Sequence, residues 1–73
     1  MSIQEISVSN NQKKSLLKAV KDEQVLFQDD NGDLVVNVEA YEEWKELKGK
    51  GGDPIEEIVG EALDYDSEYF VFS

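Results

Sequence analysis

The sequence predicts a small α+β domain of order β-α-β-β-α, followed by a C-terminal helix and an aromatic, strand-like tail. Three observations lead to this prediction. An Asn-Gly pair separates two alternating apolar runs, capping residues precede segments with apolar residues at helical spacing, and glycines cluster over residues 49–52. Because 73 residues form one domain at most, we expect a compact domain over residues 1–48, a glycine-rich joint over 49–52, and a C-terminal helix and tail over 53–73. The last part either completes the domain or forms an arm.

The first two elements follow from short-range patterns. Residues 3–9 alternate loosely between apolar and polar side chains, which indicates a short strand. Ser9 and Gln12 have the spacing of a capping box, in which each side chain accepts a hydrogen bond from an unpaired backbone N–H. The helix that begins there should end near Lys21 or Asp22. Its predicted apolar face consists of Leu16, Leu17 and Val20.

Residues 24–38 are predicted to form a hairpin. Asn31-Gly32 is the preferred dipeptide of a two-residue type I′ turn, because both positions need a positive φ. This turn would pair Asp30 with Asp33 and Phe27 with Val36. One face of the hairpin would then carry Val25, Phe27, Leu34, Val36 and Val38.

A second helix is predicted over residues 39–48. Its apolar positions at helical spacing are Ala40, Tyr41, Trp44 and Leu47. The following Gly49-Lys50-Gly51-Gly52 has the composition of a flexible joint.

The C-terminal part begins with strong helix-start signals. Asp53 is a good N-cap, Pro54 fits the first helical turn, and Glu56 completes an acidic variant of the capping box. The apolar stripe of this helix would consist of Ile55, Ile58, Val59, Ala62 and Leu63. Gly60 inside it should weaken the helix by about 1 kcal/mol relative to alanine. Residues 69–72 are aromatic and strand-like.

Charge is the main compositional signal. Seventeen acidic residues face seven lysines, arginine is absent, and the net charge is −10. Such a field repels phosphate backbones and anionic lipids and attracts basic protein surfaces. The alternative explanation is that the charge only keeps the protein soluble. The N-terminal segment differs, because four of the seven lysines lie within its first 21 residues, namely Lys13, Lys14, Lys18 and Lys21.

The residue types present limit which catalytic, disulfide and metal sites the chain can form. The chain has no cysteine and no histidine, so disulfides, thiolate metal sites and the commonest zinc ligand are excluded. The acidic turn at Asn31-Gly32 does not fit a calcium loop, because the alignment puts Phe27 and Val38 where carboxylates are required. We therefore expect no enzymatic activity, no metal and no cofactor. Without a run of about 20 apolar residues or a signal-peptide pattern, we expect a cytoplasmic protein.

Residues 6–48 resemble the prevent-host-death (Phd/YefM) antitoxins. The resemblance is carried by Lys14-Ser15-Leu16-Leu17-Lys18-Ala19-Val20, by Gln24-Val25-Leu26-Phe27, by Asn31-Gly32-Asp33-Leu34-Val35-Val36-Asn37-Val38, and by Glu39-Ala40-Tyr41-Glu42-Glu43-Trp44. It implies a dimer that contacts DNA through the N-terminal strand and first helix and neutralises a basic toxin with an acidic C-terminal arm. Carried over, Lys13, Lys14 and Lys18 would face DNA, although the residues alone favour a solvated helix face as the explanation of these lysines.

Two functions of different kinds remain open. In the antitoxin-like one, the C-terminal segment binds a basic protein partner, and the partner-binding residues would be Ile55, Ile58, Val59, Leu63, Tyr69, Phe70, Phe72, Glu57, Glu61 and Asp64. In the other, a compact monomer mimics nucleic acid and inhibits a DNA- or RNA-binding protein, as a phage anti-defence protein or nuclease inhibitor would. As a third alternative, the chain is a small regulatory or structural protein of a phage or bacterium that has no strong binding site.

Overall fold

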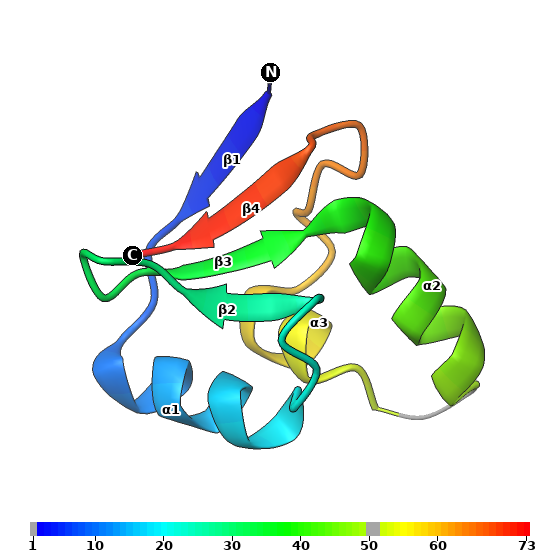
Figure 1. The fold of residues 1–73 in the computed structure, drawn as a ribbon, viewed down its shortest axis with the longest axis horizontal. Helices are drawn as coiled ribbons and strands as arrows, with labels where there is room; N and C mark the ends of the chain where they lie inside the picture. The colour runs from blue at the N-terminus through cyan, green and yellow to red at the C-terminus, as the bar shows by residue number, and fades with distance from the viewer. Residues whose placement is uncertain (1, 50–51) are drawn as a thin grey trace.

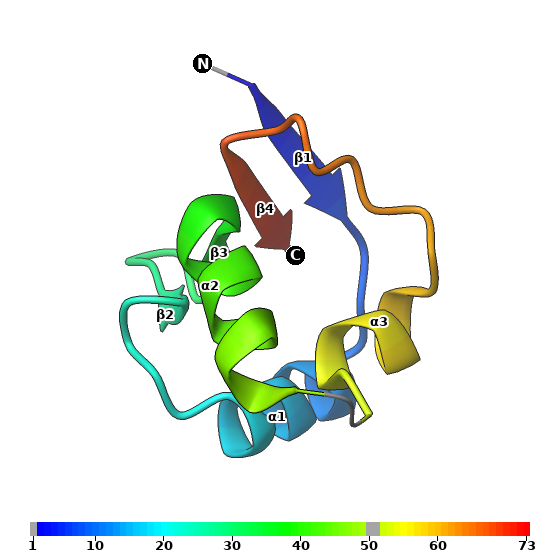
Figure 2. The same ribbon diagram turned by 90° about the vertical axis from the view of Figure 1, so that its right-hand side faces the viewer.

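The computed structural model describes residues 2–49 and 52–73, and these form an α+β domain with a four-stranded mixed sheet. The elements in chain order are β1 (Ile3–Ile6), α1 (Asn10–Ala19), β2 (Leu26–Gln28), β3 (Leu34–Asn37), α2 (Val38–Lys48), α3 (Pro54–Val59) and β4 (Tyr69–Phe72). The three helices lie on one side of the sheet (Figures 1 and 2). The predicted fold class and the order of its elements are confirmed, and the aromatic tail is the strand β4.

The strand order is β1-β4-β3-β2, so the last strand of the chain lies inside the sheet. β4 pairs in parallel with β1 and antiparallel with β3, and β2 pairs antiparallel with β3. The first and last strands of the chain therefore lie side by side (Figure 1). Deleting β4 would separate β1 from the rest of the sheet.

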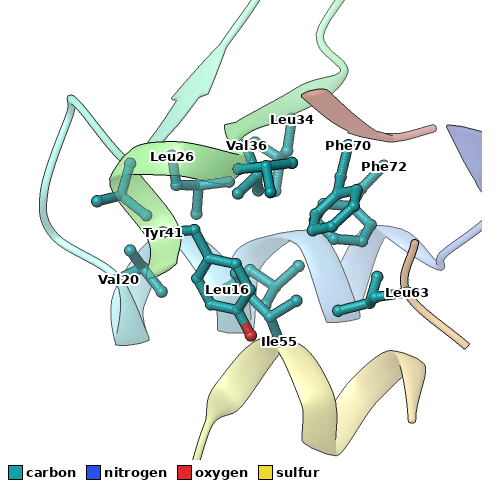
Figure 3. Packing of buried hydrophobic residues seen from close by; sticks show 12 residues of the cluster. Leu16, Val20, Leu26, Leu34, Val36, Tyr41, Ile55, Leu63, Phe70 and Phe72 are labelled. Carbon is teal, nitrogen blue, oxygen red and sulfur yellow. The ribbon is translucent and has the colours of Figure 1, made fainter. Parts of the chain in front are cut away.

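The core lies between the sheet and the helices (Figure 3). The sheet contributes alternate residues of its strands, and each helix contributes at least one fully buried side chain. The buried hydrophobic residues are Leu16, Val20, Val25, Leu26, Leu34, Val36, Val38, Tyr41, Ile55, Leu63, Phe70 and Phe72. The C-terminal part of the chain thus supplies four of the twelve core side chains.

The predicted capping box at the start of α1 is confirmed by its hydrogen bonds. The Ser9 hydroxyl accepts from the Gln12 N–H at 3.2 Å, and the Ser9 N–H donates to the Gln12 side chain at 2.8 Å. Asn37 caps α2 by accepting from the Ala40 N–H at 3.2 Å. α1 ends at Ala19, slightly before the predicted boundary.

Leu17 does not belong to the apolar face of α1 as predicted. Its side chain is 39% exposed, whereas Leu16 and Val20 are buried. Leu16 and Val20 are four residues apart and therefore share one side of the helix, while Leu17 lies on the flank.

The predicted hairpin register is wrong by one residue. The structure pairs Phe27 with Val35 and Leu26 with Val36, not Phe27 with Val36. Asp29 donates its N–H to the Asp33 carbonyl at 2.9 Å, so the loop has three residues rather than two. Of the two central residues of the predicted turn, Gly32 has a positive φ, of 85°, and Asn31 does not, which excludes a type I′ turn at Asn31-Gly32.

This change of register exchanges the two faces of β2. Leu26 is 3% exposed and belongs to the core, whereas Phe27 is 40% exposed on the opposite side. A slip of one residue moves every side chain of a strand to the other face. The predicted core position of Phe27 is therefore corrected to the outer face of the sheet.

The apolar faces of α2 and α3 contain fewer residues than predicted. Leu47 is 90% exposed, because the last turn of α2 extends beyond the sheet (Figure 1). α3 ends at Val59, and Gly60 is its C-cap with φ 80° rather than an internal residue. Ala62 and Leu63 thus lie outside the helix, although Leu63 is still buried.

Only part of the predicted joint over residues 49–52 can be placed. Gly49 is the C-cap of α2, with φ 77°, and Gly52 accepts a hydrogen bond from the Lys48 ammonium through its carbonyl. Lys50 and Gly51 lie outside the described residues.

None of the helices within residues 2–49 and 52–73 covers the second face of the sheet (Figures 1 and 2). One row across its four strands consists of Glu5, Val71, Val35 and Phe27. The next row consists of Ile3, Tyr69 and Asn37. We call these seven residues the open sheet face. Five of its seven side chains are hydrophobic or aromatic.

Candidate functional site

The outer side of α2 carries a continuous row of carboxylates. Glu39, Glu42, Glu43 and Glu46 are all exposed, and their spacing puts them on one face of the helix. We call these four residues the acidic face of α2. The opposite side of the helix contains buried Tyr41 and the half-buried Trp44 and Lys45. The helix is therefore fixed by one side and presents only negative charge on the other.

A hydrogen bond from a buried tyrosine holds α2 against α3. The Tyr41 hydroxyl donates to Oδ2 of Asp53, which is the N-cap residue of α3. Oδ1 of the same carboxylate accepts from the Ile55 N–H at 2.9 Å and from the Glu56 N–H at 3.4 Å. Asp53 thus caps α3 with one oxygen and binds α2 with the other.

Lys45 adds a second connection between the same two helices. Its ammonium donates to Oε1 of Glu56 at 2.7 Å and lies 3.6 Å from Oδ2 of Asp53. The Tyr65 hydroxyl, from the segment before β4, donates to the same Glu56 oxygen at 2.7 Å. The contacts of Lys45 and Glu56 therefore join α2, α3 and the segment before β4.

These contacts shift the proton affinities of the groups. The hydrogen bond from Lys45, followed by that from Tyr65, lowers the pKa of Glu56 below its ordinary value. The hydrogen bond to Glu56 raises the pKa of Lys45. Burial, followed by the hydrogen bond to Asp53, raises the pKa of Tyr41. At neutral pH all three groups keep the charge states that these hydrogen bonds require.

Aromatic packing also fixes the inner side of α2. The Tyr41 ring stacks on Trp44 and on Tyr65, each with centroids 6.2 Å apart. The Lys48 ammonium lies 4.9 Å from the centroid of the Trp44 ring, a distance at which a cation attracts the ring face. The positive charges of α2 are thus directed inward or along the flank, away from the acidic face.

The structure separates the ten predicted partner-binding residues into two groups. Ile55, Leu63, Phe70 and Phe72 are buried in the core, and Ile58 and Val59 pack against it. The four core side chains are closed to a partner while the domain is folded, whereas Ile58 and Val59 remain half-buried at its surface. Glu57, Glu61 and Asp64 are exposed, and Tyr69 is half-buried on the open sheet face.

The predicted DNA-contacting lysines lie on the outside of α1. Lys13 and Lys14 line a recess of about 220 Å³ between α1 and the β2–β3 turn, and Lys18 is exposed. The Lys13 ammonium lies 3.9 Å from Asp33, so part of its charge is compensated within the chain. The acidic turn thus reduces the positive potential available to a phosphate backbone.

A shallow depression of about 440 Å³ lies beside the tyrosine–lysine network and is lined by Glu42, Lys45, Glu46 and Tyr65. Among residues 2–49 and 52–73, no group of three or more acidic, histidine or cysteine side chains is arranged to hold a metal ion. Over the same residues, no helix is long and apolar enough to cross a membrane.

Sequence reasoning did not single out the acidic face of α2. The signal is present in the spacing of Glu39, Glu42, Glu43 and Glu46, which repeats at helical intervals. Comparison of the chain with protein-family models, curated proteins and solved structures gives no match. What the protein does is therefore inferred from its own surface and charge.

Proposed function

We propose that this protein is a non-enzymatic, acidic binding protein of the cytoplasm that inhibits a basic DNA- or RNA-binding protein by presenting carboxylates in place of phosphates. The partner would be recognised by its positive surface, because a chain of net charge −10 attracts such surfaces over a distance. Opposite charge also speeds the association of two proteins.

The acidic face of α2 is the observation that carries the proposal. A helix rises about 1.5 Å per residue, so the seven steps from Glu39 to Glu46 span about 10.5 Å and contain one carboxylate per about 3.5 Å. One strand of B-DNA has one phosphate per about 3.4 Å of axis. A groove that binds a phosphate backbone would therefore meet a similar density of negative charge along α2.

The position of β4 favours a folded inhibitor over an antitoxin-like arm. An arm that wraps a toxin with residues 53–73 would have to withdraw Phe70 and Phe72 from the core and remove β4 from between β1 and β3. Breaking the centre of a four-stranded sheet would expose most of the core. The antitoxin-like alternative shares the basic partner but needs this rearrangement.

A short synthetic peptide of alternating lysine and serine can test the attraction to a basic partner. We expect the protein to bind this peptide at low ionic strength and to remove the peptide from a DNA duplex to which it is bound. The affinity of the protein for the peptide should fall steeply as salt is added. Fluorescence anisotropy of the labelled duplex would report the displacement.

Charge placement is tested by two variants that each lose four negative charges. Replacing Glu39, Glu42, Glu43 and Glu46 with glutamine should weaken displacement more than replacing Asp22, Glu23, Glu57 and Glu61 with their amides. Equal weakening by both variants would show that only the total charge matters, which contradicts phosphate mimicry by α2. Absence of binding at low ionic strength would contradict the basic partner itself.

A further inference from the structure

The open sheet face is more apolar than a solvent-facing sheet usually is. A sheet with one face in water alternates hydrophobic inward and polar outward residues, whereas strands covered on both faces are continuously hydrophobic. β4 reads Tyr-Phe-Val-Phe, and β3 begins Leu-Val-Val. This pattern is typical of strands that are covered on both sides.

The apolar side chains of the open sheet face are contiguous. Phe27 lies opposite Val35, and Val35 lies opposite Val71, so these three form one line across neighbouring strands. Ile3 and Tyr69 pair in the adjacent row. Ile3 is 54% exposed and Phe27 is 40% exposed, so both ends of the patch are accessible. The patch is small, but its two exposed hydrophobic side chains on a sheet face without a described helix make it a candidate binding surface.

A second copy of the chain does not fit this patch well. Four strands about 4.8 Å apart, each with residues rising about 3.3 Å, cover roughly 15 by 13 Å, or about 200 Å². A stable interface needs about 800 Å² on each partner. Any partner placed on the patch alone would bury far less than that, so a stable contact has to include the surroundings of the patch. The net charge of −10 on each copy opposes the association of two copies there.

A basic partner fits the surroundings of the patch better. Glu5 lies in the same row as Val71 and Val35 and is exposed. Exposed carboxylates also occur beyond both ends of the strands, at Asp30 in the turn after β2 and at Glu39 and Glu68 at the opposite end. The Val38 N–H donates to the Glu68 carbonyl at 3.2 Å, which places this last pair of acids at one end of the sheet.

We propose that the open sheet face is the centre of the docking surface for the basic partner, which inserts apolar side chains over Phe27, Val35 and Val71 and surrounds them with lysines or arginines. The inference rests on the proposed function for the charge of the partner and adds where and how it docks. An apolar centre with a polar or charged rim is the usual organisation of a protein interface. Glu39, the first carboxylate of α2, lies at one end of this face and would belong to its charged rim.

Two matched peptides can test this docking surface on the full chain. The first has a central segment of leucine and valine flanked by lysines, and the second replaces the apolar residues with serine. We expect the first to bind at least tenfold more tightly than the second. NMR shift changes on binding should be centred on the amides of Phe27, Val35 and Val71.

Variants on the open sheet face provide the specific control. Phe27→Thr and Val35→Thr keep strand-forming residues at partly exposed positions, and each should remove most of the advantage of the apolar peptide. Leu47→Thr, which changes a leucine that is 90% exposed on α2, should leave both affinities unchanged.

The outcomes separate the two proposals. Equal binding of both peptides, unaffected by Phe27→Thr, would overturn the docking surface and leave the basic partner standing. Failure of both peptides to bind at low ionic strength would overturn the basic partner and, with it, this inference. A dimer in sedimentation experiments on the free protein, dissociated by Phe27→Thr, would show that a second copy covers the face and would also overturn the proposal.

Discussion

Tyr41 combines a buried ring with a hydroxyl that donates to the Asp53 carboxylate. Removing the hydroxyl in Tyr41→Phe would leave one carboxylate oxygen without its buried donor, and hydrogen bonds to charged groups contribute about 1.5–3 kcal/mol. We expect the free energy of unfolding to fall by about 2 kcal/mol in urea denaturation. Leu47→Ala, at an exposed position, should change it by less than about 0.5 kcal/mol.

Glu56 should make stability depend on acid pH. Its pKa is lowered in the folded protein by Lys45 and Tyr65, so its contribution is present above the pKa of the unfolded chain and is lost as the pH falls through the folded pKa. Lys45, whose pKa is raised, keeps its charge throughout this range. In Glu56→Gln the carboxylate cannot form at any pH.

The urea midpoint measured at several pH values can check this dependence. The wild-type protein should be more stable than Glu56→Gln at neutral pH, and the difference should shrink as the pH falls below the ordinary range of glutamate. A difference that stayed constant into acid would show that the carboxylate charge contributes nothing.

At the scale of elements, the position of Gly60 at the end of α3 determines whether replacing it with alanine stabilises or destabilises the domain. A glycine inside α3 would be improved by alanine, but the structure puts Gly60 at the C-cap with φ 80° and ψ −158°, a region that is essentially restricted to glycine. A Cβ there would meet no atom within 4 Å, so only backbone strain counts. We expect Gly60→Ala to destabilise the domain by about 1–3 kcal/mol. Thermal unfolding can measure this, with Glu61→Ala as the neighbouring control.

The register of the β2–β3 hairpin can be tested by truncating adjacent residues. Leu26→Ala should cost about 2–5 kcal/mol, because it empties a core position. Phe27→Ala should cost much less, since that ring lies on the open sheet face. The two costs in chemical denaturation would be reversed if Phe27 pointed into the core.

For the whole molecule, the central position of β4 predicts that the C-terminal residues are among the most stable. Amide hydrogens of β4 should exchange only by global unfolding, because strands β1 and β3 pair with it on both sides. Deleting residues 69–73 should abolish cooperative unfolding. Fast exchange over β4 in the free protein, or a folded truncated chain, would instead favour the antitoxin-like arm.

The sequence by itself determined the features whose partners are close along the chain. The capping box of Ser9 and Gln12 joins residues three positions apart, and Asp53 caps α3 two residues further on. The helical spacing of α2 likewise predicted its bounds to within one residue. Such contacts depend on local backbone geometry, so the residue types at fixed offsets are enough to predict them.

Only the tertiary structure decided how distant parts of the chain meet. Asn31-Gly32 suits a two-residue turn locally, but pairing with β4 and burial of Leu26 select the other register. The parallel pairing of β1 with β4 and the hydrogen bonds of Tyr41 and Lys45 to α3 join separate elements. Local preferences amount to a fraction of the free energy of burying several large side chains, so packing in three dimensions overrides them.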